Sequence, residues 1–366
     1  MTTNRRNFLK GGTAAATGIV FCSCGLLERA HAQTGGRTLP VVVNGKKVKT
    51  IDVHSHCHFH EAGALLSPAD AAAVQLPPVR GAEEAFIEVD KRLKVMDAQA
   101  VDMEVLSINP FWYGRDRDLA GKIVKIQNEK LAELCASKPE RFAAFASLTL
   151  QAPDLAVQEL ETAVKKQGLK GAAIGGAVAG VEFSDPKFHP VWAKAEELGV
   201  PLFIHPQGVP ELGKRLSCNG WLGNTIGNPL ETTIALSHLI FEGTLDRFPG
   251  LKVIAAHGGG YLPSYADRSD HACMVGPAGC DPKVVLKKKP TEYLKQLYFD
   301  SLIFTPEALR HLAAQVGATQ IVLGSDYPYP WELHPVDHIF ASSSLSDDEK
   351  MAILGTTAAK LLNIKA

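Results

Sequence analysis

The chain lacks a charge imbalance and, in its body, any long hydrophobic run. Its 366 residues include 38 basic and 39 acidic side chains, for a formal net charge of −1. Such a balance provides no basic footprint for nucleic acid, so no nucleic-acid partner is expected. No apolar stretch after the N-terminal segment is long enough to span a bilayer. Hydrophobic residues nevertheless make up 46% of the chain, which is ample for a buried core.

Paired cysteines of the redox or zinc-ribbon type are also missing. Of seven cysteines, two lie in the N-terminal segment, at Cys22 and Cys24. The others show no C-x-x-C pair, and an odd, scattered set argues against a disulfide framework. We expect most of them to be small buried side chains; they are Cys57, Cys135, Cys218, Cys273 and Cys280.

The first 32 residues resemble a twin-arginine signal peptide. The segment NRRNFLK at 4–10 is followed by a weakly hydrophobic run at 11–27 and an A-x-A cleavage site at 30–32. Cleavage after Ala32 would leave a mature chain of 33–366 in the bacterial periplasm, with no membrane anchor. A lipobox at Cys24 is the alternative, although the residues before it lack the usual leucine.

From residue 41 onward, predicted strands and helices alternate. A hairpin at 41–48 turns at Asn44-Gly45. Eight longer strands are predicted at 48–56, 101–108, 142–150, 169–175, 200–205, 251–257, 297–303 and 320–326. Helices are predicted at 83–99, 118–137, 153–167, 190–198, 229–248, 306–316 and 347–362, with Gly199 as a C-cap. The alternation predicts one α/β domain over 33–366, a (β/α)8 TIM-type barrel.

A doubly wound open sheet is the alternative fold. It would usually carry a glycine-rich phosphate turn after the first strand, where this chain has HSHCH at 54–58. The segment 57–82 is rich in Ala, Pro and Gly and is predicted to be a loop over the barrel mouth. We expect its His58 and His60 to face solvent or substrate rather than a metal.

Histidines and one aspartate stand at the carboxyl ends of four predicted strands. His54 and His56 share one face of the first strand because they are two residues apart. In a barrel these strand ends surround a single pocket, so distant residues can share one ion. Imidazoles and a carboxylate suit Zn²⁺, with Mn²⁺ or Fe²⁺ as the alternatives. The other strand-end residues are His205, His257 and Asp326. For each histidine taken alone, a buried structural role is the alternative.

Seven segments carry a family resemblance: IDVHSH (51–56), MD…VDMEVLSINP (96–110), LTLQAPDLAVQELE (148–161), FIHP (203–206), NPLETTIA (228–235), FPGLKVIAAHGGGYLPSYADR (248–268) and IVLGSDYPYP (321–330). Through them the chain resembles the amidohydrolase superfamily. Within it, the resemblance is to the branch of 2-amino-3-carboxymuconate-6-semialdehyde decarboxylase and related aromatic-acid decarboxylases.

The resemblance implies a ligand set and a catalytic group. One metal ion would be bound by His54, His56, His205 and Asp326, with His257 as the acid/base group. Many relatives outside this branch hold two metals, bridged by Lys or Glu at the end of the fourth strand. Here that strand ends in Gly175-Gly176, which implies a single metal.

The resemblance also implies residues around the metal. Glu231 would orient a ligand or its helix, with an ordinary helix-dipole carboxylate as the alternative. Arg268 would grip a substrate carboxylate in the neighbouring subunit's pocket, which implies a homodimer; a structural salt bridge is the alternative. Trp221 would wall the pocket or pack in the core. The loop 57–82 departs from the family and offers only Arg80 as a second substrate arginine.

Three functions follow as hypotheses. The first is a non-oxidative decarboxylase (carboxy-lyase) of an unsaturated or aromatic carboxylic acid, with His257 or Asp326 handling the proton. The second is a hydrolase of a lactone, amide or ester that uses a metal-bound hydroxide. The third, a metal-dependent binding protein without turnover, is disfavoured because a proton-transfer set accompanies the ligands. Hydride transfer and nucleotide chemistry have no support in the sequence.

Overall fold

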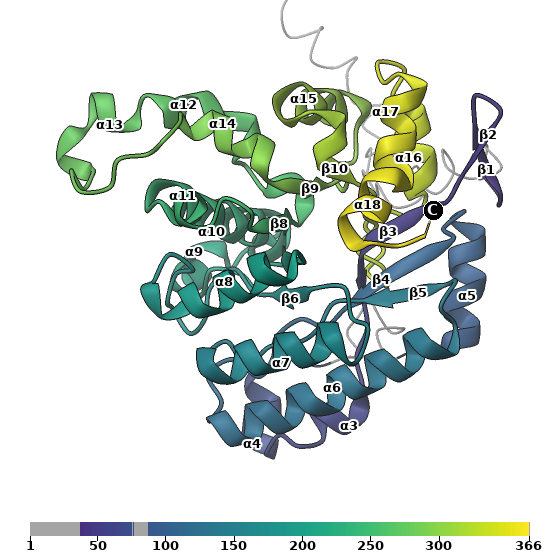
Figure 1. Cartoon of the computed structure of the whole chain (residues 1–366), viewed down its shortest axis with the longest axis horizontal. Coiled ribbons are helices and arrows are strands. Elements are labelled where there is room, and N and C mark those ends of the chain that lie inside the picture. The colour runs from purple at the N-terminus through teal and green to yellow at the C-terminus, as the bar shows by residue number, and fades with distance from the viewer. Residues whose placement is uncertain (1–36, 75, 77–86, 366) are drawn as a thin grey trace, which may run out of the picture. The chain divides into compact units, whose positions relative to one another are not determined.

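The computed structural model describes residues 37–74, 76 and 87–365 (Figure 1). Residues 37–366 group into one compact unit. The predicted signal peptide and Arg80 lie outside the described residues, as does the start of the helix predicted at 83–99. Among the described residues, no helix combines the length and apolar character needed to cross a membrane.

A short hairpin precedes the barrel, as predicted. Its strands are β1 (Val41–Val43) and β2 (Lys46–Val48), paired antiparallel. Asn44 and Gly45 have φ of 47° and 74°. Both turn residues therefore occupy the left-handed region that a two-residue hairpin turn requires.

Eight parallel strands form a closed ring within the described part of the chain. They are β3 (Ile51–His56), β4 (Met103–Ser107), β5 (Phe142–Ala144), β6 (Ala172–Ile174), β7 (Pro201–Ile204), β8 (Lys252–Ala255), β9 (Tyr298–Asp300) and β10 (Ile321–Val322). Regular ladders join β3 to β5 and β6 to β10. Isolated parallel bridges close the two remaining seams, between Ala146 and Ala172 and between Asp52 and Leu323. The predicted (β/α)8 barrel is confirmed, and the open doubly wound sheet is excluded.

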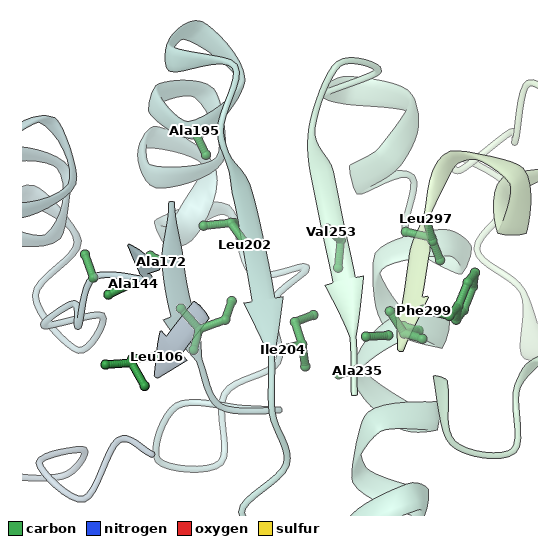
Figure 2. Packing of buried hydrophobic residues seen from close by; sticks show 14 of the residues in the cluster. Leu106, Ala144, Ala172, Ala195, Leu202, Ile204, Ala235, Val253, Leu297 and Phe299 are labelled. Atoms are coloured by element: carbon green, nitrogen blue, oxygen red, sulfur yellow. The ribbon is translucent and has the colours of Figure 1, made fainter. Parts of the chain in front are cut away.

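The strands are largely buried on both faces, which is why β6 and β7 are continuous apolar runs. Inside the barrel, the rings of Phe145 and Phe203 stack with centroids 5.7 Å apart. Outside it, Leu202 and Val253 contribute to the core shared with the surrounding helices (Figure 2). Each strand is shorter than predicted. β5 and β10 lose mainly their carboxyl ends, which leave the ladder, whereas β3 keeps its carboxyl end at His56 and begins later than predicted.

Helices surround the strands (Figure 1). Gly199 ends α8 with a φ of 66° and is the predicted C-cap. The helix predicted at 229–248 is interrupted at Gly243, where φ is 74°. The helix predicted at 347–362 contains a π-helical stretch, 352–356. The helices are α3 (His60–Gly63), α4 (Pro68–Ala73), α5 (Val89–Ala98), α6 (Arg117–Ser137), α7 (Pro153–Lys165), α8 (His189–Leu198), α9 (Gly213–Leu216), α10 (Asn228–Phe241), α11 (Thr244–Arg247), α12 (Ala266–Asp270), α13 (Ala272–Val275), α14 (Pro290–Tyr293), α15 (Pro306–Val316), α16 (Pro335–Ala341), α17 (Asp347–Met351) and α18 (Thr357–Leu362).

The prediction of an irregular loop over 57–82 is wrong in its first part, which contains α3 and α4. Ser67 caps α4 by accepting a hydrogen bond from the main-chain N–H of Asp70, and Pro68 occupies the first helical position. A serine N-cap followed by proline is a helix start signal. The Ala, Pro and Gly content of the segment obscured this signal.

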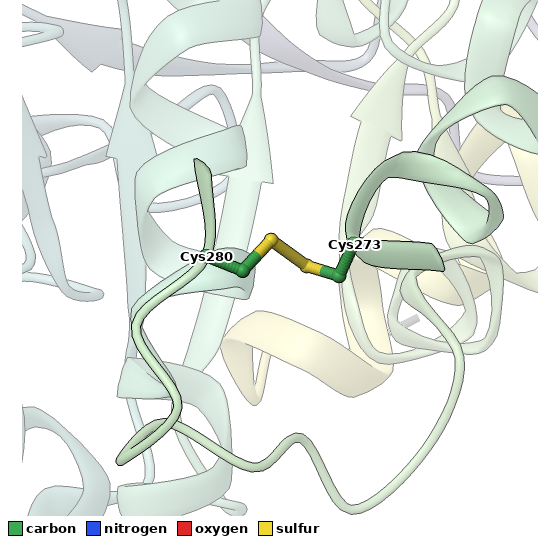
Figure 3. Close-up of a disulfide and its surroundings, with 2 residues drawn as sticks. All are labelled: Cys273 and Cys280. Carbon is green, nitrogen blue, oxygen red and sulfur yellow. A yellow bond between two sulfur atoms is a disulfide. The ribbon is translucent and has the colours of Figure 1, made fainter. Parts of the chain in front are cut away.

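The expectation of unpaired, mostly buried cysteines is also wrong. Cys273 and Cys280 form a disulfide (Figure 3). They lie in the segment α12–α14, which extends away from the strands (Figure 1), and α13 with the following turn brings them together. Their spacing of seven residues matches no short cysteine motif. Of the remaining described cysteines, Cys57 is buried, whereas Cys135 is half-buried and Cys218 is exposed.

Candidate metal centre

The four predicted ligands converge at the carboxyl ends of the strands. His54 and His56 end β3, His205 follows β7, and Asp326 follows β10. One ligand atom from each lies within 4.8 Å of the others, and all four residues are buried. His56 Nε2 is 2.9 Å from Asp326 Oδ1 and 3.1 Å from His54 Nε2. The predicted convergence is therefore confirmed.

The cluster fits a divalent cation on its own chemistry. Both ring nitrogens of His205 are buried without a hydrogen-bond partner in the described structure, and a bound cation would satisfy one of them. Burial alone would lower the pKa of His54, but the carboxylates of Asp326 and Asp300 raise it to about 10. Burial opposes ionisation of Asp326, yet the neighbouring imidazoles hold its pKa well below the ordinary value. The site therefore favours a positive charge among these atoms.

Asp300 is a functional residue that the sequence reasoning missed. His54 Nδ1 donates to Asp300 Oδ2 at 2.6 Å, which leaves Nε2 of His54 directed at the cluster. Asp300 also accepts from the main-chain N–H groups of His257 and Gly258, at 2.9 and 2.8 Å. It ends β9, so applying the strand-end criterion to the seventh strand would have identified it.

His257 lies directly after β8, beside the cluster. Its Nε2 is 3.5 Å from Asp326 Oδ2, and its side chain is 16% exposed, against 0 to 5% for His54, His56 and Asp326. His257 and Asp326 both have positive φ, at 56° and 65°. Non-glycine residues in this region concentrate at functional sites. The placement suits the predicted acid/base role, which stays a prediction.

Glu231 contacts the loop that follows a ligand rather than an imidazole. Its Oε2 accepts from the N–H of Gly208 at 2.7 Å and from the N–H of Gln207, two residues after His205. Burial raises its pKa to about 7. The Glu231 carboxyl also covers Gly176 after β6, where an added Cβ would approach its side chain to 2.5 Å. The end of the fourth strand thus offers no ligand of its own.

A cavity of about 580 Å³ opens beside the cluster and is lined by His56, His205 and Asp326. Trp221 also lines it, although this side chain is 58% exposed. The Trp221 indole stacks on Trp331, with centroids 5.6 Å apart and planes at 11°. Of the two alternatives, Trp221 therefore lies at the cavity and not in the core; its role toward a substrate stays a prediction.

The remaining candidates divide between the cavity and the surface. His58 is buried and lines the cavity, so it faces the substrate space, whereas His60 is exposed. Arg268 is exposed on α12 and does not line the cavity of its own chain. A direct role of Arg268 would therefore require a second subunit.

A model of the amidohydrolase family matches residues 51–364. The chain belongs to this family. The 2-amino-3-carboxymuconate-6-semialdehyde decarboxylase of Dictyostelium discoideum is 34% identical to this chain over 279 residues, which are 75% of this chain and 76% of that protein. The family predicted from the seven motifs is confirmed.

Two solved amidohydrolase-fold structures illustrate the similarity. A 2,6-dihydroxybenzoate decarboxylase in complex with 2,6-dihydroxybenzoate superposes with a TM-score of 0.76 and 27% identity, covering 86% of this chain and 99% of that one. A dihydroxybenzoic acid decarboxylase from Polaromonas sp. JS666, with bound manganese and the inhibitor 2-nitroresorcinol, has a TM-score of 0.74 and 25% identity. The match covers 87% of this chain and 98% of that one.

Proposed function

We propose that the protein is a metal-dependent, non-oxidative decarboxylase of an unsaturated or aromatic carboxylic acid. The observation that carries the proposal is the His257–Asp326 contact of 3.5 Å beside the cavity. It combines a proton-transfer pair with a metal-ligand cluster. Similarity to decarboxylases of carboxylated aromatic and muconate compounds supports the same reaction.

The residues divide the work of such a reaction. When bound, a divalent ion supplies positive charge that holds and polarises a substrate oxygen. Loss of CO2 leaves an electron pair on the carbon that carried the carboxylate, and this carbon must gain a proton. His257 and Asp326 can hold that proton between them and deliver it. The lining aromatic residues Phe111 and Tyr329 would hold a planar substrate and exclude water from it.

A product assay with a panel of aromatic acids and lactones tests the proposal. Released CO2, measured with the metal-loaded protein, supports decarboxylation. Ring opening of lactones with no CO2 from any acid would reject the proposal in favour of the hydrolase alternative.

The proposed metal is zinc, held by His54, His56, His205 and Asp326. Three imidazoles and one carboxylate form a four-ligand donor set that suits Zn²⁺. The bound manganese of the Polaromonas relative makes Mn²⁺ the competitor. Elemental analysis of the purified protein, followed by reconstitution of the stripped protein with each ion, distinguishes the two.

The proposed assembly is a homodimer in which Arg268 enters the partner's cavity. Its exposure on α12 supports a role outside its own subunit. Within the segment that carries it, Asp270 accepts hydrogen bonds from the main chain and hydroxyl of Thr291, at 2.9 and 2.8 Å, and so ties α12 to α14. Sedimentation analysis of the full mature chain tests the dimer.

The proposed compartment is the periplasm, reached by the twin-arginine route. The Cys273–Cys280 disulfide supports it, because disulfides persist mainly in oxidising compartments. Cell fractionation tests this proposal, with Arg5→Lys/Arg6→Lys as the matched export-deficient variant. Equal periplasmic recovery of the two forms would reject it.

A further inference from the structure

Asp326 is the clustered residue with the least support from regular structure. His54 and His56 lie within β3, and His205 directly follows β7. Asp326, in contrast, lies four residues beyond β10, which ends at Val322. Its φ of 65° is in the left-handed region, which an L-residue keeps only where the surrounding structure holds it there. Contacts other than the strand ladder must therefore hold the Asp326 backbone.

The hydroxyl of Ser325 connects the chain on both sides of Asp326. Its Oγ donates to Asp52 Oδ2 and accepts from the main-chain N–H of Tyr327, the latter at 3.1 Å. The main-chain N–H of Ser325 also donates to Asp52, with 3.2 Å to Oδ1. Ser325 and Asp52 are fully buried, so water does not compete for these hydrogen bonds. The residues immediately before and after Asp326 are thus both fixed through one hydroxyl.

The Asp52 carboxylate joins this turn to the strand that carries two other clustered residues. Its Oδ1 also accepts from the main-chain N–H of His54 at 3.0 Å. The Asp326 N–H in turn donates to the main-chain carbonyl of His54 at 2.8 Å. Among the described residues, β3 and β10 share isolated bridges and no ladder. The carboxylate therefore adds hydrogen bonds at a seam where the sheet itself provides few.

The orientation of Asp326 decides what each of its carboxylate oxygens contacts. Oδ1 lies 2.9 Å from His56 Nε2, within the metal-ligand cluster, whereas Oδ2 lies 3.5 Å from His257 Nε2. A rotation of the Asp326 backbone would change both contacts together. The direction of this carboxylate thus affects metal binding and the proton shared with His257 at once.

We propose that Asp52 and Ser325 are positioning residues, whose hydrogen-bonded pair holds Asp326 with one oxygen toward the metal-ligand cluster and the other toward His257. Neither side chain lines the cavity, so both act through Asp326 and not on the substrate. The catalytic part of this inference rests on the proposed decarboxylase function. Its metal-binding part rests on the cluster alone.

Removal of the Ser325 hydroxyl tests the inference. We expect Ser325→Ala to lower the affinity for Zn²⁺ and Mn²⁺, and kcat at saturating metal, by about 10–100-fold, the usual effect of losing a group that orients a metal ligand. KM should change little, because the cavity wall is intact. Competition with a chromophoric chelator measures the affinity. Urea unfolding of the metal-free protein establishes that the variant is folded under the assay conditions.

Ser301→Ala is the matched control. Ser301 is also buried, and its Oγ accepts from the main-chain N–H of Gly324 at 3.3 Å, one residue before Ser325. This hydroxyl does not contact the residues on either side of Asp326, so we expect metal affinity and kcat close to those of the wild type. If Ser325→Ala lowers stability but matches Ser301→Ala in metal affinity and kcat, Ser325 has only a structural role and the inference is overturned.

A second pair of variants separates the Ser325 hydroxyl from the space that it fills. Ser325→Thr and Ser325→Val add nearly the same volume, but only threonine retains the hydroxyl. Ser325→Thr should keep at least about tenfold higher metal affinity and kcat than Ser325→Val. Because the crowding is the same in both, this comparison stands even where Ser325→Ala is too unstable to assay. Equal values for the two variants would overturn the inference.

A double-variant cycle tests whether the two residues act as a pair. Asp52→Asn keeps the shape of the side chain and removes the charged acceptor of the Ser325 hydroxyl, so it should also lower metal affinity. In Asp52→Asn/Ser325→Ala, the second change should lower metal affinity less than Ser325→Ala does in the wild type. Strictly additive effects would mean that the residues act independently, which would overturn the proposed pair.

The metal measurements keep this inference separate from the proposed function. A wild-type protein that releases no CO2 from any acid rejects the decarboxylase, yet the metal affinities of the variants still decide whether the Asp52–Ser325 pair positions Asp326. Unchanged metal affinity in Ser325→Ala would overturn the inference whether or not CO2 is released.

Discussion

Arg92 donates from Nη2 to the main-chain carbonyl of His56 at 2.6 Å, and so a buried arginine on α5 fixes the end of the strand that carries two metal ligands. Its Nη1 donates to Glu104 at 2.8 Å and to Ser55 at 3.0 Å. Its guanidinium carbon lies 4.6 Å from the ring centroid of Tyr327, the residue after Asp326. One side chain therefore contacts both strand ends from which three of the four ligands come.

Arg92→Met should destabilise the protein by about 3–5 kcal/mol, because it leaves the Glu104 carboxylate buried without its partner. Arg92→Met/Glu104→Leu should recover much of that loss, since replacing both partners by apolar groups removes the unpaired charge. Arg117→Met is the matched control: its pair with Asp154 is exposed, and the expected loss is below about 1 kcal/mol. Urea unfolding measures all three. Similar losses of stability for the Arg92 and Arg117 variants would refute the assignment of Arg92 as the buried partner that Glu104 requires.

Asp300→Asn should weaken metal binding by about 10–100-fold, the usual effect of removing the carboxylate that orients a ligand imidazole. An amide at this position cannot keep the proton on Nδ1 of His54 as the Asp300 carboxylate does. Metal affinity is measured by competition with a chromophoric chelator. Asp118→Asn, an exposed change in the first turn of α6, is the control. Unchanged affinity in Asp300→Asn would show that the 2.6 Å contact does not support the metal.

His257→Ala should keep the metal while losing about 10²–10⁴-fold in activity, the range of a general acid/base. The expectation follows because His257 contacts Asp326 but is not one of the four clustered ligands. Metal content and CO2 release are measured on the same preparation. His189→Ala, on α8 and away from the cavity lining, is the control. Full activity in His257→Ala would end its assigned role, and loss of metal would make it a ligand.

The sequence predicted the residues whose placement follows from local rules. His54, His56, His205 and Asp326 were found because a strand has a period of two and barrel strands share one mouth. Arg92 was not found, because it stands in the charged segment VDKRLKVMDA, which resembles a solvated helix face. Only packing against β4 distinguishes Arg92 from its charged neighbours. The Cys273–Cys280 disulfide was missed for a related reason, since its pairing depends on the turn after α13.

Arg268→Ala should raise the KM of carboxylate substrates far more than it affects hydrolysis of an uncharged ester. The physical reason is loss of a guanidinium that would hold the carboxylate from the partner subunit. Arg310→Ala, exposed on α15, is the matched control. The oligomeric state of both variants is measured by sedimentation, so that loss of the dimer is not mistaken for loss of the contact between Arg268 and the substrate carboxylate. If neither substrate class responds, Arg268 has no role in binding.

Glu231→Gln should alter how stability depends on pH. Burial raises the pKa of Glu231 from its ordinary value of 4.5 to about 7, so the folded state holds this proton more tightly than the unfolded state does. The favourable contribution of this proton to the stability of the folded state is fully present below pH 4.5 and is lost as pH rises toward 7. Above that pH, the ionised carboxylate in the wild type costs up to about 3 kcal/mol relative to its behaviour at low pH.

Glutamine preserves the contacts that matter, because both main-chain donors, Gln207 and Gly208, bind the same Oε2. Relative to wild type, we expect Glu231→Gln to gain stability between pH 5 and 8, by up to about 3 kcal/mol. Urea unfolding at several pH values measures the difference. Glu133→Gln, exposed on α6, should show a nearly flat difference over this range. A flat difference for Glu231→Gln as well would mean that the carboxyl is already ionised at pH 5 and that its two hydrogen bonds outweigh its burial.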